Sequence, residues 1–408
     1  PWTSGYRNEG EASPAGANCR RKGLSARGQA RPHRLTPPRE PATDTAQRNV
    51  QGRATRMTAI FDILVIGSGI AGASVAARLS QSGRRIVLIE GETHPGYHST
   101  GRSAAVWEPA YGPLAIRQLT RASAAFFTAP PTGFTDAALM TPLAILTVAP
   151  EERQHRIAEE LAAMPDAKQV RISPAEAEAR MPVLKKGWTK AALLTEAAGA
   201  LDVDAIHQGF LKLFKATGGS LVTNATVTAL EHQKGLWHAT TRQGTFTAPI
   251  VVNAAGAWAD QLGQMAQAEP IGLKPLRRTA LTVAAPSGLD TAGLPMTLDV
   301  DEEFYIKPDA GRLLLSPANE DLETPGDTQP DDYDIALCVW RIEEATDLKI
   351  SKIERKWAGL RSFVADKAPV AGWSARAENF FWLAGQGGYG IQTAPALSAF
   401  AAAQLLGQ

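Results

Sequence analysis

A glycine-rich turn between an apolar strand and a small-residue helix constrains this sequence most. The run Ile60–Ile66 is apolar at all but one position, which is typical of a strand buried on both faces of a parallel sheet. The turn Gly67-Ser-Gly69-Ile-Ala-Gly72 follows, and a helix is then predicted over Ala71–Leu79 and a second strand over Arg85–Glu90. This order predicts a unit that binds the phosphates of a dinucleotide.

Each residue of the turn has a physical task in such a unit. Gly67 permits the tight turn, Gly69 lets the backbone approach the pyrophosphate, and Gly72 lets the helix close on the strand. The phosphates then meet the helix N-terminus, where Ile70 and Ala71 lie. Glu90, eighteen residues past Gly72, ends the second strand and is placed to accept hydrogen bonds from ribose hydroxyls, with Gly91 beside it. A lone GxGxxG is weak evidence, but the flanking elements make chance occurrence a poor explanation.

The stretch after Glu90 favours FAD over NAD. NAD enzymes usually continue directly into another helix and strand, whereas here a long polar segment, Gly91–Ser103, intervenes. Loops of this length inside a compact domain are usually functional. Small residues and hydroxyls can pack against a flat ring and donate to its carbonyls, and Arg102 can offset pyrophosphate charge. The alternative is a surface connection with chance Gly and Ser. The residues assigned to the cofactor here are Ser99, Thr100, Gly101, Arg102, Ser103, Ala104, Ala105 and Val106.

The remaining sequence predicts an α/β (α+β) fold with a discontinuous Rossmann-like FAD/NAD(P)-binding domain and an inserted antiparallel-sheet substrate domain. Apolar strands followed by small residues or glycine-rich turns, which are typical of nucleotide-binding domains, occur at both ends and in the middle of the chain. Between them lie strand-like segments in which apolar and polar residues alternate. We therefore assign 57–110, 199–272 and 352–408 to the nucleotide-binding domain and 111–198 and 273–351 to the substrate domain. Further elements are predicted as strands at Leu143–Val148, Pro249–Asn253, Arg278–Val283, Glu303–Lys307, Arg312–Ser316 and Phe380–Ala384, a small antiparallel sheet over Leu221–Thr247, and helices opening at Ser173, over Asp204–Ala216, Trp258–Met265 and Tyr333–Ala345, and at the C-terminus.

The first 56 residues differ from the rest in charge and composition. They hold eleven Lys/Arg and four Asp/Glu, which leaves 31 basic and 37 acidic residues from Met57 onward. The predicted folded part is thus mildly acidic, and no nucleic-acid partner is expected. The segment lacks apolar periodicity, so we interpret it as a disordered leader or a non-native extension, translated from upstream of Met57, with a transit peptide as the alternative.

The positions of the cysteines and the hydropathy of the chain bear on where the protein is located and on how it binds its cofactor. The two cysteines, Cys19 and Cys338, lie far apart and form neither a disulfide framework nor a metal site. The most apolar stretch, Ile391–Leu406, is Ala-rich and broken by polar residues, which favours a buried helix over a membrane span. We expect a cytoplasmic protein without a metal, with peripheral attachment at the inner membrane as an alternative. Since Cys338 falls in a predicted substrate-domain helix, the FAD is expected to be non-covalent.

Several strings resemble the D-amino-acid oxidase/glycine oxidase family of flavoproteins, and the likeness is closest to its D-arginine dehydrogenase branch. The resemblance begins at His98-Ser-Thr-Gly-Arg-Ser-Ala-Ala105 with Tyr111-Gly112 and covers nearly all of the chain from Ile60 onward. It implies the fold described above, FAD as cofactor, and oxidation of an amino acid. Its other strings are 252–258, 304–311, 357–363 and 385–393.

The resemblance also implies roles for particular residues. Tyr111, Arg278, Tyr305 and Arg361 match positions that hold the substrate. Their chemistry suits an amino acid, because a planar guanidinium binds a carboxylate bidentately and a tyrosine hydroxyl adds a further bond. Alternatives are structural salt bridges for the two arginines and a core position for Tyr305. Residues implied along the flavin are Val227, Gly256, Gly359, Gly388, Tyr389, Gly390, Ile391 and Gln392, of which Gly388 also adjoins the substrate.

Two departures from the D-arginine dehydrogenase pattern bear on the substrate. Val106 stands where those enzymes carry a histidine, and Ile145 stands where they place the carboxylate that meets the basic end of the substrate. An apolar residue cannot pair a guanidinium, and burying one unpaired is costly. The sequence therefore predicts a preference for neutral or apolar D-amino acids, or another small amine-bearing acid, over D-arginine. His98 is a candidate base, although a role in the flavin loop is favoured.

The predicted reaction is oxidative deamination of a D-amino acid. A hydride passes from the α-carbon to flavin N5, and the resulting imino acid hydrolyses to a 2-oxo acid and ammonia. Oxygen or a quinone is expected to accept the electrons. The alternatives are oxidation of N-substituted amino acids or of 2-hydroxy acids, and a role as the flavin-binding subunit of a larger complex.

Overall fold

The computed structural model describes residues 60–408, so the predicted leader lies outside the described residues. A six-stranded sheet carries the glycine-rich turn, in the order β20-β21-β13-β1-β2-β9. Its inner strands pair in parallel, with Ile63–Ile66 beside Ile250–Asn253 on one side and beside Ile86–Ile89 on the other. The strands are β1 (Ile63–Ile66), β2 (Ile86–Ile89), β9 (Ser220–Val222), β13 (Ile250–Asn253), β20 (Val370–Trp373) and β21 (Phe380–Ala384).

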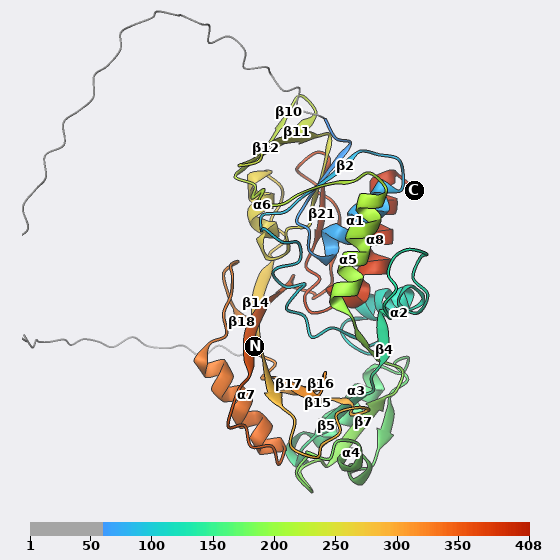
Figure 1. Ribbon diagram of the computed structural model, residues 1–408, viewed down its shortest axis with the longest axis vertical. Coiled ribbons are helices and arrows are strands. Elements are labelled where there is room, and N and C mark those ends of the chain that lie inside the picture. The colour runs from blue at the N-terminus through green and yellow to red at the C-terminus, as the bar shows by residue number, and fades with distance from the viewer. Residues whose placement is uncertain (1–59) are drawn as a thin grey trace, which may run out of the picture. The chain divides into compact units, whose positions relative to one another are not determined.

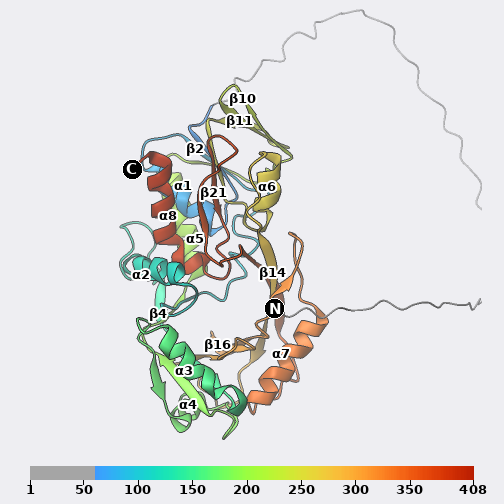
Figure 2. The ribbon, with the colours of Figure 1, turned by 180° about the vertical axis from the view of Figure 1, so that it is seen from behind.

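Both faces of this sheet are covered, which explains its continuous apolar strands. Helices α1 (Ile70–Ser80), α5 (Val203–Ala216) and α8 (Gly390–Leu406) lie side by side on one face and pack on residues such as Ile63 and Val65 (Figures 1 and 2). On the other face, Leu64 and Ile66 pack with α6 (Ala259–Met265) and with an antiparallel sheet of β10 (Ala229–Gln233), β11 (Leu236–Thr241) and β12 (Gly244–Ala248).

The first and last of these three helices are joined by a partly buried arginine. Arg78 of α1 donates from Nε to Ser398 Oγ and from Nη2 to the Pro395 carbonyl, each at 2.9 Å. The two helices are about 320 residues apart in sequence. Parts of the chain that are distant in sequence therefore form one wall.

A nine-stranded sheet forms the second large layer, in the order β18-β14-β17-β16-β15-β5-β7-β6, with β19 pairing β14. Helices α4 (Pro174–Arg180) and α7 (Asp332–Ala345) pack on one of its faces (Figure 1). Its strands are β5 (Ile145–Ala149), β6 (Val170–Ile172), β7 (Ala191–Thr195), β14 (Lys274–Ala284), β15 (Met296–Asp299), β16 (Tyr305–Asp309), β17 (Arg312–Ser316), β18 (Asp321–Leu322) and β19 (Arg355–Phe363).

A smaller set of elements connects the two large sheets. Strands β3 (Val106–Trp107), β8 (Gly199–Leu201) and β4 (Met140–Pro142) form a three-stranded sheet. Helix α2 (Leu114–Thr128) packs against α8, and α3 (Gln154–Ala163) packs on β5 and β7. No helix within residues 60–408 has both the length and the apolar character needed to cross a membrane.

The predicted α/β fold with its Rossmann-like unit is confirmed, with corrections to individual elements. Ser220–Val222 does not belong to the small antiparallel sheet, because it pairs in parallel with β2. The large sheet is not wholly antiparallel, since β15 and β5 run in parallel. Within the segment 352–408 that was assigned to the nucleotide-binding domain, β19 pairs with β14 of the large sheet. The assignment of domains itself stays a prediction.

Candidate active site

Three adjoining cavities run from the ends of β1 and β2 toward the nine-stranded sheet. The Glu90 cavity, of about 460 Å³, lies beyond the ends of β1 and β2. The central cavity, of about 130 Å³, shares Gly69 and Ser99 with it. The Tyr111 cavity, of about 80 Å³, shares Arg361 and Gly388 with the central cavity. Shared walls make the three cavities one elongated site, which is the shape that a dinucleotide with a substrate beyond it requires.

The glycine-rich turn is packed too closely for side chains. Gly67 has a φ of +98°, and a Cβ there would lie 2.4 Å from the Ala254 carbonyl oxygen. A Cβ on Gly72 would lie 1.8 Å from the Gly67 carbonyl oxygen. Backbone cannot yield to such contacts, so both glycines are required for α1 to begin this close to β1. The N-cap residue of α1, Gly69, supplies no side-chain cap, and the first turn has no acidic residue, which suits an anion.

Hydrogen bonds hold the surroundings of this turn in place. Glu90 accepts from the Ser68 backbone N–H at 2.8 Å and from the Ser68 hydroxyl at 2.7 Å. Ile70 donates its backbone N–H to Thr100 Oγ1 at 3.0 Å, which ties the long polar loop to the start of α1. The loop predicted to follow the second strand therefore closes directly over the helix N-terminus.

His98 lies in the Glu90 cavity and does not line the Tyr111 cavity. Its Nε2 is 3.0 Å from Glu92 Oε1, and its ring packs on Trp258 with 4.7 Å between ring centroids. This position is at the end of the site away from Arg361. It supports the predicted loop role for His98 and gives no support to a role as base.

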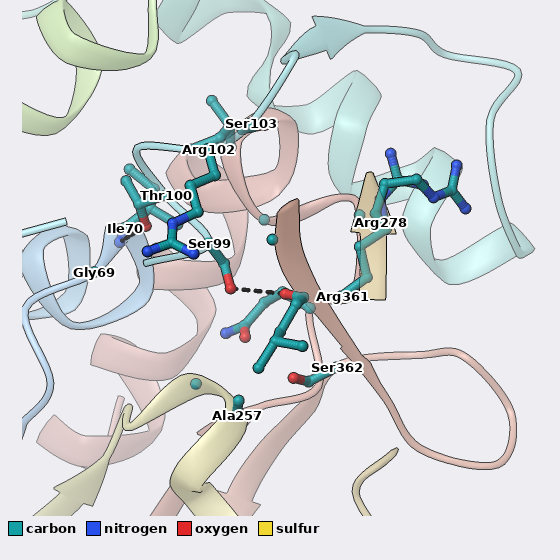
Figure 3. Close-up of a pocket in the computed structure, with 18 of the residues that line it drawn as sticks. Gly69, Ile70, Ser99, Thr100, Arg102, Ser103, Ala257, Arg278, Arg361 and Ser362 are labelled. Carbon is teal, nitrogen blue, oxygen red and sulfur yellow. Dashed lines mark hydrogen bonds between the residues drawn. The ribbon is translucent and has the colours of Figure 1, made fainter. Parts of the chain in front are cut away.

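The central cavity is bounded by seven segments of the chain, which contribute glycine backbone and small residues as well as Arg102, Arg278 and Arg361. Ser99 donates to the Leu360 carbonyl at 2.7 Å and thereby fastens the loop to β19, beside Arg361 (Figure 3). The N-terminus of α8, with Gly388, Gly390 and Ile391, forms another wall and carries no acidic residue in its first turn. Uncapped N–H groups at that terminus stabilise negative charge on a bound group.

Arg102 lines the central cavity, but its guanidinium is already engaged. It forms a salt bridge with Asp327 and donates to the Thr328 and Ala358 carbonyls at 2.9 Å each. Its contact with Asp327 also lowers the pKa of that carboxyl below its ordinary value. The structure therefore shows Arg102 fastening the loop to the large sheet, and the predicted contact with pyrophosphate stays a prediction.

The Tyr111 cavity brings together all five residues that the sequence assigned to the substrate, which are Tyr111, Arg278, Tyr305, Arg361 and Gly388. Arg361 donates to the Tyr111 hydroxyl at 3.2 Å, and that hydroxyl donates to Glu302 Oε2 at 3.3 Å. Burial raises the pKa of the Tyr111 hydroxyl, which keeps it protonated and able to donate.

The two arginines differ in how their charge is balanced. Arg278 is 7% exposed and bonds Glu320 Oε1 at 3.0 Å and the Asn319 carbonyl at 2.9 Å. Arg361 has no carboxylate within salt-bridge distance among the residues that the structure describes. A Cβ on Gly388 would lie 2.9 Å from the Arg361 guanidinium carbon, so the glycine makes room for that guanidinium. Arg361 thus gives the site a positive charge that is available to bind an anion.

Most of the predicted cofactor residues line one of the three cavities. The exceptions are Gly72, Gly101 and Tyr389. Gly72 packs against the turn, Gly101 donates its N–H to the Gly96 carbonyl, and Tyr389 packs on Tyr111 with 5.0 Å between ring centroids. Those that line the cavities are Gly67, Gly69, Ile70, Ala71, Glu90, Gly91, Ser99, Thr100, Arg102, Ser103, Ala104, Ala105, Val106, Val227, Gly256, Gly359, Gly388, Gly390, Ile391 and Gln392.

Two acids in the Tyr111 cavity were missed by sequence reasoning. Glu108 and Glu302 both line it, together with the apolar Met296, Leu298 and Phe304. Burial raises the pKa of the Glu108 carboxyl to about 7, and the nearby charge of Glu160 adds to this. Neither acid belongs to a motif. Their proximity to Val106 and Tyr305 in sequence was the one available signal.

Comparison with known proteins gives two informative relatives. The L-2-hydroxyglutarate dehydrogenase of Escherichia coli is 26% identical over 221 residues, and the match spans about half of each chain, 52% of this one and 51% of the other. The hydrogen cyanide synthase subunit HcnC of Pseudomonas aeruginosa is 25% identical, with 83% of this chain and 90% of that protein covered.

Solved structures share the fold. Glycine oxidase from Bacillus cereus superimposes with a TM-score of 0.73 at 21% identity, covering 85% of this chain and 95% of that one. L-α-Glycerophosphate oxidase from Mycoplasma pneumoniae, solved with FAD bound, has a TM-score of 0.77 at 19% identity, with the same coverage of each chain.

The three cavities fit FAD, because one end offers a carboxylate for ribose, the middle offers the N-termini of α1 and α8 without acidic residues, and glycine backbone forms much of the walls. The family model described as FAD dependent oxidoreductase matches residues 62–405. The protein therefore belongs to this DAO family and is an FAD-dependent oxidoreductase.

Proposed function

We propose that this protein oxidises the α-carbon of a small, neutral D-amino acid. FAD, when bound, supplies the acceptor for the hydride that leaves this carbon. The imino acid formed then reacts with water to give a 2-oxo acid and ammonia. The observation that supports this most directly is the convergence of Tyr111, Arg278, Tyr305 and Arg361 on one small cavity beside Gly388.

These residues have separate tasks in the proposal. Arg361, the guanidinium without a carboxylate partner, and the buried Arg278 bind the substrate carboxylate, with the Tyr111 and Tyr305 hydroxyls as further donors. Fixing the carboxylate sets the α-carbon toward the wall formed by Gly388, and such orientation can supply much of the rate enhancement.

The choice of a neutral side chain rests on two cavity residues. Val106 and Ile145 both line the Tyr111 cavity, at the positions where the D-arginine dehydrogenase pattern has a histidine and a carboxylate. A guanidinium placed against Ile145 would gain no partner there to replace its hydration. The two acids of the cavity are otherwise placed, because Glu302 accepts from the Tyr111 hydroxyl and burial raises the pKa of Glu108 to about 7. The D configuration follows from the resemblance of the sequence strings to that branch.

Anaerobic flavin reduction tests the proposal. The holoprotein is mixed under nitrogen with D-alanine, D-leucine, D-arginine, the L-enantiomers and glycine, and bleaching of the flavin is followed. We expect D-alanine or D-leucine to bleach the flavin fastest. A kcat/KM highest for D-arginine or D-lysine, or for L-enantiomers, would contradict the substrate assignment. Admitting air afterwards separates oxygen from a quinone as the electron acceptor.

Oxidation of a 2-hydroxy acid or an N-substituted amino acid is the second candidate reaction. The similarity to L-2-hydroxyglutarate dehydrogenase favours keeping hydroxy acids in the panel. The similarity to HcnC, named as a subunit, supports the third alternative, a flavin-binding subunit of a larger complex. Gel filtration together with turnover by the isolated chain distinguishes that alternative. Division into the two domains assigned above, a cytoplasmic location and peripheral membrane attachment remain part of the proposal.

A further inference from the structure

The Tyr111 cavity has a second polar wall, formed by Glu108 and Gln392, that the proposed reaction does not use. The sequence assigned Gln392 to the flavin, but this residue lines the Tyr111 cavity and not the central cavity. Both residues line the cavity, and they are only 6% and 3% exposed. Glu108 directly follows β3, and Gln392 lies in the first turn of α8. The wall therefore joins two segments that are far apart in sequence.

Two backbone hydrogen bonds fix how these side chains lie. The Glu108 N–H donates to Gln392 Oε1 at 3.0 Å, and the Ala110 N–H donates to Glu108 Oε1 at 2.9 Å. Because the Glu108 N–H needs an acceptor, the first bond fixes the amide of Gln392 with its oxygen toward the backbone and its NH₂ group away from it. Each side chain thus has one polar atom engaged.

The other polar atom of each side chain is left over. Glu108 Oε2 and Gln392 Nε2 are both buried and have no hydrogen-bond partner within residues 60–408. Buried polar groups are nearly always paired, and an unpaired one destabilises the protein by the cost of its lost hydration. Two such atoms on hydrogen-bonded neighbours at one cavity indicate that a group placed in the cavity completes them.

The chemistry of the missing partner follows from these atoms. An ionised Glu108 offers an acceptor, and the NH₂ group of Gln392 offers a donor. Their complement is a group with a donor and an acceptor close together. A carboxamide has both, an aliphatic branch has neither, and a carboxylate has acceptors alone.

We propose that Glu108 and Gln392 form a side-chain subsite that selects a substrate with a neutral carboxamide-type group. The inference rests on the proposed function, in which Arg278 and Arg361 take the α-carboxylate. Ile145, Met296 and Leu298 line the same cavity and contact the methylene part of the side chain. The asparagine side chain is then preferred over that of leucine, which has nearly the same shape.

Binding of substrate analogues that lack the amine tests the subsite without turnover. Succinamate, 4-methylpentanoate and succinate share a carboxylate and a two-carbon chain and end in a carboxamide, an isopropyl group and a carboxylate. Each is titrated into the holoprotein at about pH 8.5, where Glu108 is ionised, and the absorbance change of the bound flavin gives Kd. Succinamate should bind at least about 10-fold more tightly than either of the others.

A conservative variant should change the preference rather than abolish binding. In E108Q the Ala110 N–H still needs an oxygen, so the new NH₂ group lies where Oε2 was, and the subsite presents two donors. Succinate should then bind more tightly than succinamate. The matched control is E160Q, because Glu160 acts on Glu108 through its charge but does not line the cavity. In E160Q the three analogues should have the same order of affinity as in the unchanged protein.

The outcomes divide cleanly. Equal binding of succinamate and 4-methylpentanoate, tighter binding of the latter, or an unchanged order in E108Q would overturn the subsite, as would the absence of any flavin perturbation by all three. Equal binding would mean that water molecules satisfy the two atoms. Flavin reduction plays no part in these titrations, so a failure of the proposed reaction shows in the anaerobic panel alone.

Discussion

The Glu90 cavity and the Tyr111 cavity are built from different kinds of wall. Around Glu90 and the central cavity, glycine backbone and the N-termini of α1 and α8 form much of the wall, together with larger side chains such as Trp258 and Arg102. Around Tyr111, the walls are large charged or aromatic side chains carried by strands, the loop after β3 and the start of α8. The first region depends on how closely backbone can approach, and the second depends on where side-chain charges lie.

Because of this difference, different kinds of substitution should disrupt each region. A site made of backbone fails when a side chain is added, because the surrounding main chain has no room to move. A site made of side chains fails when a functional group is removed, because its partners remain buried and unpaired. Mutations should therefore separate cofactor retention from substrate recognition.

The largest effect is expected for Gly72→Ala. Its Cβ would lie 1.8 Å from the Gly67 carbonyl oxygen, so α1 must move away from the turn. We expect FAD affinity to fall at least about 100-fold, which corresponds to about 3 kcal/mol. The flavin content of the purified protein measures this. The control is Gly372→Ala, where a Cβ meets nothing within 4 Å and no left-handed φ is required. Full flavin content in Gly72→Ala would refute the argument.

Arg361→Met should impair substrate recognition and leave flavin binding unchanged. Flavin content should stay normal, while kcat/KM for the preferred substrate should fall by about 100-fold, since a buried charge pair with the substrate is broken. Steady-state kinetics and flavin absorbance measure the two quantities. Arg355→Met, an exposed position on the same strand, is the control. Loss of flavin in Arg361→Met would break the distinction between the two regions.

Glu108 should make stability depend on pH. Its pKa is raised from 4.5 to about 7 in the folded protein, so between these values the folded chain keeps a proton that the unfolded chain loses. The free energy of unfolding should therefore fall as pH rises through this window, by up to about 3 kcal/mol relative to E108Q. Urea unfolding of both holoproteins at several pH values measures this. A difference that does not change with pH would show that Glu108 is not buried in the way described.

Tyr111→Phe should give the smallest effect. It removes the hydroxyl that accepts from Arg361 and donates to Glu302, but it leaves the ring packed on Tyr389. We expect KM to rise about 10-fold, with flavin content unchanged. A loss of kcat without a change in KM would instead place the hydroxyl in the chemical step.

Sequence reasoning predicted correctly those elements whose structure is determined by residues close together in the chain. The turn Gly67–Gly72 and the strand before it could be predicted, because chain geometry within a few residues dictates glycine and apolar runs. The capping serine Ser173 was predicted for the same reason, and its side chain accepts from the Glu176 N–H. The fold class and FAD followed from such local units.

Sequence reasoning failed where contacts between distant segments decide. Glu108 has no motif, and its importance comes from burial beside Gln392, which is set by packing of α8. The pairing of β9 with β2 and of β19 with β14 likewise depends on partners far along the chain. Helix α2 was also missed, although it packs against α8 next to the site. The roles of the site residues remain predictions for the experiments above.

The hydrogen bonds from Arg78 to Ser398 and Pro395 have a consequence for how the protein matures. They join segments about 320 residues apart, so the wall between α1 and α8 forms only after nearly the whole described chain has been synthesised. Contacts of such long range are slow to form, because the entropic cost of closing the loop is incurred first. The first strand, turn and helix cannot hold a flavin while they emerge alone. Cofactor capture therefore requires α8 to have joined α1, and bound FAD then stabilises the assembled fold by mass action.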